Sequence, residues 1–152
     1  MSDHKATISW RLGDGDFQKG RYSRAHTWTF DGGVTVPGSP SPAVVPAPWS
    51  QADAVDPEEA FVAAIASCHM LTFLWLASRA GVVVTSYTDE AVGTMTKNER
   101  GVPWVSSVAL QPRIEWAGTP PAAAKLAELH HHAHEQCFIA NSVKTDIRVR
   151  VS

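Results

Sequence analysis

Cysteine is scarce in this sequence, and its scarcity limits what the thiols can do. Cys68 and Cys137 are the two cysteines among 152 residues. A small secreted domain held together by many disulfides is therefore not expected. Two cysteines in an intracellular chain are more often reactive, metal-binding or inert than a structural cross-link. We treat both thiols as candidate functional groups.

The sequence also lacks a surplus of charge of either sign. Its formal net charge of −2 gives no electrostatic footprint for nucleic acid or an anionic membrane, so we expect neither among its partners. No apolar segment follows Met1–Lys5, which predicts no signal peptide and a cytoplasmic protein. The length predicts a single domain over residues 1–152, and 44% apolar residues can form a fair core.

Charged residues are missing from Ala60 to Ala77, inside a helix predicted to start at Pro57 and to stop at Gly81. Asp56 and Glu59 have the spacing of a capping box, which marks the start of this helix. A helix that is apolar on nearly every face must be buried on all sides or lie in a bilayer. The run is barely long enough to span a membrane and has polar side chains at its centre, so we expect burial. A chain this short cannot wrap it alone, and we predict a homodimer whose partner subunit supplies the cover.

The remaining pattern predicts strands on both sides of this helix and a second helix near the end. The expected strands cover residues 6–12, 28–36 (a hairpin), 87–97, 104–116 and 143–151. Pro112 places the fourth of these segments at a sheet edge, or at a position whose amide needs no partner. The second helix is expected to start with Thr119 as its cap and to fray near Asn141. Hairpin-sized links favour an antiparallel α+β fold.

Cys68 lies about three turns inside the first predicted helix, too far from its start for the helix dipole to ionise the thiol. A buried thiol without a neighbouring cation keeps its proton and is inert. His69 is adjacent in sequence but points about 100° away around the helix, so the cation must come from elsewhere. A buried cation needs a counter-charge, and Glu58 in the first turn can hold an arginine by two hydrogen bonds.

The motif Asp56-Pro57-Glu58-Glu59, followed by Cys68 and by a second cysteine in Glu135-Gln136-Cys137-Phe138-Ile139-Ala140-Asn141, resembles the OsmC/Ohr family. The resemblance implies antiparallel sheets around two long helices and an intertwined homodimer with active sites at the subunit interface. It also implies a thiol-dependent peroxidase for organic hydroperoxides, without a cofactor. Cys68 would attack the peroxide, and Cys137 would resolve the sulfenic acid to a Cys68–Cys137 disulfide. An external dithiol, by resemblance one of the lipoyl type, would recycle the enzyme.

The family's activating arginine stands either in the early strands or in the loop before the Pro-Glu motif. Residues 31–57 contain no Arg or Lys, which leaves Arg24 and Arg21. Arg24 is the preferred candidate because it is nearer the predicted strand, and Arg21 is the alternative. His26, close by, is expected to face outward. After the second cysteine, Phe138-Ile139-Ala140 replaces the proline-led turn that is commoner in the family.

Histidines near the second cysteine leave another interpretation open. They are His130, His131, His132 and His134. The spacing of His130, His134 and Cys137 on one helix face could bind zinc, in a metal- or ligand-binding module without peroxide turnover. A redox sensor that forms the same disulfide without sustained turnover is a further alternative.

Overall fold

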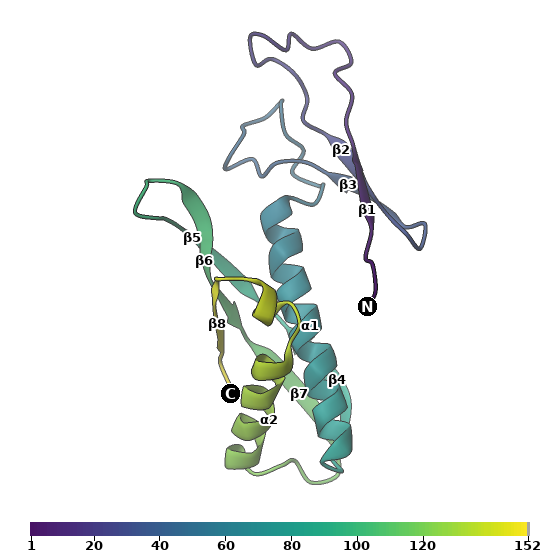
Figure 1. Ribbon diagram of the computed structural model, residues 1–152, viewed down its shortest axis with the longest axis vertical. Coiled ribbons are helices and arrows are strands. Elements are labelled where there is room, and N and C mark those ends of the chain that lie inside the picture. Colours follow the sequence, from purple (N-terminus) through teal and green to yellow (C-terminus); the bar gives the residue numbers. More distant parts are fainter. Residues whose placement is uncertain (152) are drawn as a thin grey trace. The chain divides into compact units, whose positions relative to one another are not determined.

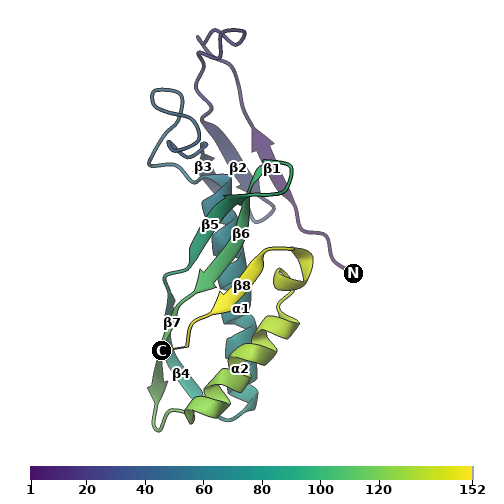
Figure 2. The ribbon, with the colours of Figure 1, turned by 90° about the vertical axis from the view of Figure 1, so that its left-hand side faces the viewer.

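The structure is a computed structural model that describes residues 1–151, which form an α+β fold (Figures 1 and 2). The chain divides into two compact units, Met1–Ala60 and Phe61–Ser152. The expectation of one domain over the whole length stays a prediction.

The first unit contains a three-stranded antiparallel sheet with the strand order β1-β2-β3. These strands are β1 (Ala6–Ser9), β2 (His26–Phe30) and β3 (Thr35–Gly38). The predicted hairpin is confirmed by the pairing of β2 with β3. Gly38 allows a close approach of the two strands, because a Cβ atom there would collide with the rings of Trp28 and His26.

The first unit has no apolar core of its own. Among residues 1–60, the buried ones are the small residues Gly38, Ser39 and Ser50. Several large apolar side chains of the same segment are more than half exposed: Ile8, Phe17, Val34 and Val44. A unit of this size with so little apolar burial needs cover from elsewhere to repay the entropy of folding.

Helix α1 (Pro57–Arg79) starts with the predicted capping box. The Glu59 amide donates to Asp56 Oδ1 at 2.7 Å, and the Asp56 amide donates to Glu59 Oε2 at 3.1 Å. Two amides that the helix leaves free are thus satisfied reciprocally. The chain leaves the helix at Gly81, whose φ of 77° favours glycine.

The rest of the chain buries one face of α1. The buried side chains recur every fourth residue, as one helix face requires: Ile65, His69, Phe73 and Ala77. Elsewhere on the helix, Leu71 is 62% and Trp75 54% exposed. By length and composition α1 could also cross a membrane, a test that core helices of soluble proteins pass as well. The expected burial on all sides is not reached within one chain.

The second unit packs α1 and α2 (Ala123–Gln136) with two sheets. Its strands are β4 (Val83–Asp89), β5 (Val92–Lys97), β6 (Pro103–Leu110), β7 (Pro112–Ala117) and β8 (Asp146–Val149). Strand β4 pairs with β7, and the other sheet has the order β5-β6-β8. Pro112 begins β7 in a two-stranded sheet, where both strands are edges, whereas the β6 part of the predicted strand is central in its sheet.

Two apolar clusters fix α1 within the second unit. Towards its C-terminal end, Phe73 and Ala77 pack against Leu129 and Ala133 of α2. Further towards its start, Ile65 packs against buried residues of β6, with half-buried side chains of β8 alongside. Figure 1 shows α1 running past both groups of elements. The segment of α1 that carries Cys68 lies between these two anchoring clusters.

Two predicted strands are each divided in the structure. The segment 87–97 belongs to β4 and β5, and the segment 104–116 belongs to β6 and β7. Both breaks occur at one place, because the Gln111 amide donates to Asp89 Oδ1 at 2.7 Å and its side chain donates to the Glu90 carbonyl. Alternation alone did not reveal that the chain changes sheets there.

The C-terminal elements also differ from the prediction in detail. Helix α2 starts after Ala122, without a side-chain cap, so Thr119 is not its cap. Residues that precede proline are pushed out of the helical region, and Thr119-Pro120-Pro121 therefore delays the helix. The helix ends at Gln136, and a 3-10 turn (Ala140–Ser142) follows. Strand β8 pairs with β6 in the parallel direction rather than antiparallel.

Candidate active site

The second unit brings the two cysteines together. Cys68 is half-buried on α1, and Cys137 is the 1% exposed residue that ends α2. Both are free thiols, and Cys68 lies close enough to Cys137 to raise the pKa of its thiol. Because α1 and α2 pack through a common apolar cluster, residues remote in sequence meet at this point. The sequence predicted this pair from the family resemblance.

The two thiols are not equivalent. Burial, followed by the neighbouring Cys68 side chain, raises the pKa of Cys137 to about 11. Cys137 therefore keeps its proton at neutral pH. Cys68 Sγ accepts the backbone amide of Ile139, at 3.5 Å. A backbone donor at Cys68 Sγ suits a sulfur that carries negative charge during a reaction.

An apolar pocket of about 630 Å³ lies beside the cysteine pair. Its walls include Leu71 and Trp75 of α1 and Phe138, which follows Cys137. Thr72 also lines the pocket, and its hydroxyl donates to the Cys68 carbonyl at 2.9 Å. The pocket has the size of a small-molecule site, and its three large apolar side chains are exposed in the single chain.

A pair of buried histidines joins α1 to α2 next to the cysteines. His69 Nε2 and His130 Nδ1 lie 3.0 Å apart, and the two rings are nearly coplanar, at 5°. Phe73 stacks on His130 with a centroid distance of 4.3 Å. His69 and His130 are each less than 4% exposed. The sequence did not indicate this pair, since His69 was assigned no partner and His130 was considered only as a zinc ligand.

Burial is the largest cause that lowers the pKa of His69 and of His130 to about 4. Both imidazoles are therefore neutral at physiological pH, and one N–H forms the bond between them. His69 Nδ1 and His130 Nε2 are buried and have no hydrogen-bond partner among residues 1–151. In either tautomer, the pair retains one buried N–H and one bare nitrogen that protonation would charge.

The zinc interpretation receives no support from the histidine geometry. Within residues 1–151, no group of three or more His, Cys, Asp or Glu side chains is arranged to hold a metal ion. His131 and His132 face outward and contact Glu135 and Glu128 on the surface of α2. The helical spacing places the histidines on nearby faces of α2, but their side chains do not point to one common site.

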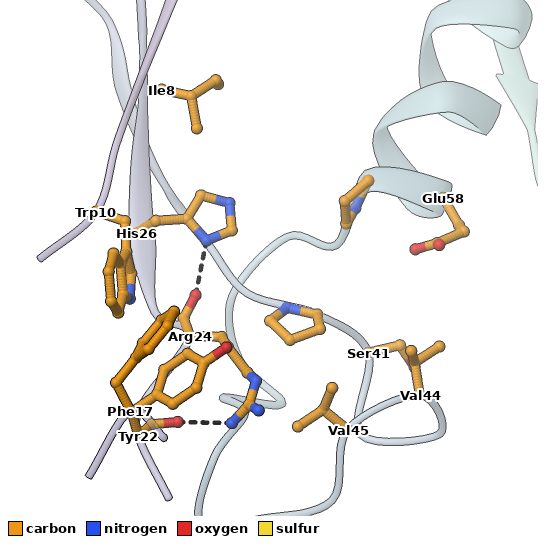
Figure 3. Close-up of a pocket in the computed structure, with 12 residues that line it drawn as sticks. Ile8, Trp10, Phe17, Tyr22, Arg24, His26, Ser41, Val44, Val45 and Glu58 are labelled. Carbon is orange, nitrogen blue, oxygen red and sulfur yellow. Dashed lines mark hydrogen bonds between the residues drawn. The ribbon is translucent and has the colours of Figure 1, made fainter. Parts of the chain in front are cut away.

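The predicted arginine lines a second pocket, which lies entirely in the first unit (Figure 3). Arg24 Nη1 donates to the carbonyl oxygens of Tyr22, at 2.7 Å, and Gly20, at 3.2 Å. Its guanidinium carbon lies 3.9 Å from the centroid of the Tyr22 ring. The Arg24 amide also donates to the Trp49 carbonyl, which ties the residue to the proline-rich loop.

The pocket around Arg24 has a volume of about 530 Å³ and mostly apolar walls. Trp10, Phe17 and Tyr22 form one wall, with ring centroids 4.9 to 6.1 Å apart. Glu58 lines the opposite side, where it extends from the start of α1 (Figure 3). The described residues 1–151 provide no salt bridge between Arg24 and Glu58, and their ion pair stays a prediction.

His26 lines this pocket, so the expectation that it faces outward is wrong. Its Nε2 accepts the indole N–H of Trp28 at 2.8 Å, because indole nitrogen can only donate. The neutral His26 ring therefore carries its proton on Nδ1, which donates to the Arg24 carbonyl at 2.7 Å. Residues 26 and 28 share one face of β2, a signal present in the sequence. Arg21, the alternative arginine, is exposed and does not line the pocket.

Acid should destabilise the protein through the buried histidine pair. The folded-state pKa of about 4 lies below the unfolded value of 6.5, so the unfolded chain binds more protons between these pH values. The unfolding free energy contributed by the pair is thus complete above pH 6.5 and is lost as the pH falls towards 4. The loss amounts to roughly 3 kcal/mol for one such histidine.

Urea unfolding at several pH values measures this loss. His130→Phe should show a smaller decrease in unfolding free energy on acidification than the natural chain. His131→Gln, one residue away on the exposed side, serves as the control and should keep the natural slope. Equal acid slopes for His130→Phe and the natural chain would contradict the assignment.

Known proteins resemble the chain over its whole length. The family model for OsmC-like proteins matches residues 50–152. An OsmC-like protein of unknown function from Vibrio cholerae is 49% identical, with a TM-score of 0.96 and 100% of both chains covered.

The same fold occurs in two more distant structures. An organic hydroperoxide resistance protein from Elizabethkingia anophelis is 18% identical, with a TM-score of 0.72 over 98% of this chain and 93% of that one. OhrB, the organic hydroperoxide resistance protein of Bacillus subtilis, is 20% identical, with a TM-score of 0.71 over 99% and 98%. No curated protein matches the chain. The match to the family model and the identity to the Vibrio protein show that the chain belongs to the OsmC-like protein family.

Proposed function

We propose that the protein reduces organic hydroperoxides, with Cys68 as the attacking thiolate and Cys137 as the resolving thiol. The observation that carries this proposal is the neighbouring pair of free cysteines, one half-buried and one buried with a raised pKa. Two structures with the same fold belong to proteins named for organic hydroperoxide resistance, which supports the same substrate class.

The proposed cycle needs no cofactor. The Cys68 thiolate attacks the terminal oxygen of the hydroperoxide, so that the O–O bond breaks and the sulfur becomes a sulfenic acid while an alcohol leaves. Cys137 then attacks the Cys68 sulfur. The S–S bond forms, and the sulfenic oxygen leaves as water with the Cys137 proton. An external dithiol, which we propose to be of the lipoyl type, returns two electrons and restores both thiols.

We assign the activation of Cys68 to Arg24 and the anchoring of Arg24 to Glu58. Arg24 is preferred over Arg21 because it lines an apolar pocket together with Glu58, whereas Arg21 is exposed. The aromatic wall of that pocket suits the hydrocarbon part of an organic hydroperoxide better than hydrogen peroxide. A cytoplasmic location agrees with this cycle, because its thiols must return to the reduced state.

A homodimer is part of the proposal. The first unit lacks a buried apolar core, and Leu71 and Trp75 on α1 and Phe138 after α2 are more than half exposed. Leu71, Trp75 and Phe138 also line one pocket, and exposed apolar side chains that gather in this way mark interaction surfaces. A second copy of the chain would cover them, in agreement with the intertwined dimer that the family resemblance implies.

A redox sensor remains the second candidate, because the same cysteine pair could signal by forming the disulfide once. Steady-state consumption of peroxide with a dithiol reductant separates the two functions. Sustained turnover identifies the enzyme, and a single stoichiometric oxidation identifies the sensor.

Stoichiometric cumene hydroperoxide should convert the two thiols into a Cys68–Cys137 disulfide, detected by mass spectrometry of the digested protein. Cys68→Ser should abolish peroxide consumption, because no nucleophile remains. Cys137→Ser should accumulate a sulfenic acid at Cys68 that dimedone traps. Hydrogen peroxide serves as the matched oxidant and should react more slowly. Persistence of both free thiols after cumene hydroperoxide would rule out the proposed reaction.

Replacing Arg24 by Ala should slow the alkylation of Cys68 by iodoacetamide at neutral pH by roughly tenfold or more, because an opposite charge no longer favours the thiolate. Arg21→Ala is the matched control and should alkylate at the natural rate. An effect of Arg21→Ala alone would move the role to Arg21. No effect of either substitution would remove arginine from the mechanism.

Light scattering after gel filtration should give twice the mass of one chain, down to micromolar concentration. Trp75→Glu places a charge on the exposed face of α1 and should weaken the dimer. Lys97→Glu, in an exposed position at the end of β5, is the control and should leave the mass unchanged. A stable monomer of the natural chain would show that the exposed apolar side chains have another role.

A further inference from the structure

The turn after α2 presents two consecutive backbone amides to the two cysteine sulfurs. The Ile139 amide donates to Cys68 Sγ at 3.5 Å, and the Ala140 amide donates to Cys137 Sγ at 3.4 Å. Each sulfur therefore has a backbone donor of its own. Both amides belong to the segment Phe138-Ile139-Ala140, directly after Cys137.

The rest of the turn is fully committed to holding this geometry. The Asn141 side chain donates to the carbonyls of Glu135 and Cys137, at 2.9 Å each, and its amide also donates to the Cys137 carbonyl. Ser142 donates its hydroxyl to the Phe138 carbonyl at 2.7 Å and its amide to the Ile139 carbonyl at 3.0 Å. The carbonyls of the turn are thus occupied from within, and the two amides remain directed at the sulfurs.

The position of Cys137 makes such a donor necessary. Cys137 ends α2, where the helix dipole is negative and opposes a thiolate. It is also buried, so water cannot solvate a charge on its sulfur. A fixed amide donor is effective in this setting, because it needs no reorganisation when the charge develops. Among the contacts of Cys137, the Ala140 amide lowers its pKa most, and the Ile139 amide lowers it less.

We propose that the two amides divide the charge of the redox cycle, with the Ile139 N–H supporting Cys68 as the attacking thiolate and the Ala140 N–H supporting Cys137 as the leaving group during reduction. This inference rests on the proposed thiol cycle and assigns a catalytic group to each of its halves. The Phe138-Ile139-Ala140 segment then serves the chemistry directly.

The reductive half explains why the second donor is needed. Cys68 is half-buried and Cys137 is 1% exposed, so an incoming dithiol attacks the Cys68 sulfur. The S–S bond breaks, Cys137 leaves with the electron pair, and the Ala140 amide stabilises that thiolate until it takes a proton. The second thiol of the reductant then attacks the mixed disulfide. A cyclic disulfide departs, and Cys68 leaves as a thiolate that the Ile139 amide stabilises.

The amides can be removed one at a time by semisynthesis of the full chain, because Cys137 is a natural ligation site. Residues 1–136 are prepared as a thioester and joined to synthetic peptides that start at Cys137. One peptide replaces the Ile139 N–H by an ester oxygen, and a second does the same at Ala140. The all-amide peptide gives the reference protein.

Each ester should slow a different reaction. The ester at Ile139 should slow iodoacetamide alkylation of Cys68 at pH 7 by about tenfold, the effect expected for one hydrogen bond to a charged group, with reduction of the preformed disulfide by dithiothreitol much less affected. The ester at Ala140 should slow that reduction by about tenfold and leave the alkylation of Cys68 near the reference rate. Equal effects of the two esters on both reactions, or no effect of either, would overturn the proposal.

Two controls separate the amides from their surroundings. An ester at Ile139 also weakens the Phe138 carbonyl as an acceptor, and Ser142→Ala, which removes the bond to that carbonyl, measures the effect of this loss by itself. The ester at Ile139 should slow the alkylation of Cys68 clearly more than Ser142→Ala does. Lys125→Gln, on the exposed surface of α2, is the second control and should keep both reference rates.

The natural chain provides a second measurement that does not depend on the folding of a variant. In the ¹⁵N-labelled protein, the amide proton of Ile139 should shift downfield as Cys68 ionises, and that of Ala140 should shift much less. An Ile139 amide that ignores this ionisation overturns the inference. Neither experiment uses a peroxide. If the protein does not reduce peroxides but each ester slows its own reaction, the proposed function alone is wrong. If peroxide forms the disulfide but neither ester changes a rate, the inference alone is wrong.

Discussion

The unequal burial of the neighbouring thiols Cys68 and Cys137 is the constraint on which this account depends. Cys137 is buried directly after a helix, where burial raises the pKa of its thiol, while Cys68 is less buried and accepts the Ile139 amide. One environment thereby produces a protonated thiol and a sulfur able to accept negative charge. Two cysteines of equal burial would give no such division of roles.

Helices α1 and α2 hold Cys68 and Cys137 next to each other. One apolar cluster anchors α1 to α2, a second anchors it to the sheet of β5, β6 and β8, and Cys68 lies between them. Next to Cys68, the buried hydrogen bond between His69 and His130 also joins α1 to α2. Such a bond fixes the direction of the contact, which apolar packing alone does not do. The turn after α2 completes the arrangement, because its internal hydrogen bonds direct two amides at the sulfurs.

The parts of the structure that follow local rules could be predicted from the sequence. The capping box of Asp56 and Glu59 and the hairpin between β2 and β3 involve residues close in the chain, and both are present as expected. The α+β class followed from hairpin-sized links and from the family resemblance. The meeting of Cys68 with Cys137 was also expected, but only through that resemblance, since no spacing rule joins residues so far apart.

The missed features depend on tertiary contacts. The break of two strands at Gln111 required the contact with Asp89, and the parallel pairing of β8 depends on where the chain returns after α2. The His69–His130 bond joins two helices, so neither helical pattern could reveal it. Backbone amides carry no sequence signature, which is why the roles of residues 139 and 140 became visible only when the sulfurs were placed.

The most direct test of this account is the pH dependence of alkylation, measured separately for each cysteine in the reduced natural protein by mass spectrometry. The account predicts that Cys68 is modified at neutral pH while Cys137 stays protected until strongly alkaline pH or unfolding. Equal modification of both cysteines, or modification of Cys137 first, would contradict the assignment of Cys68 as the reactive sulfur and Cys137 as the protonated thiol.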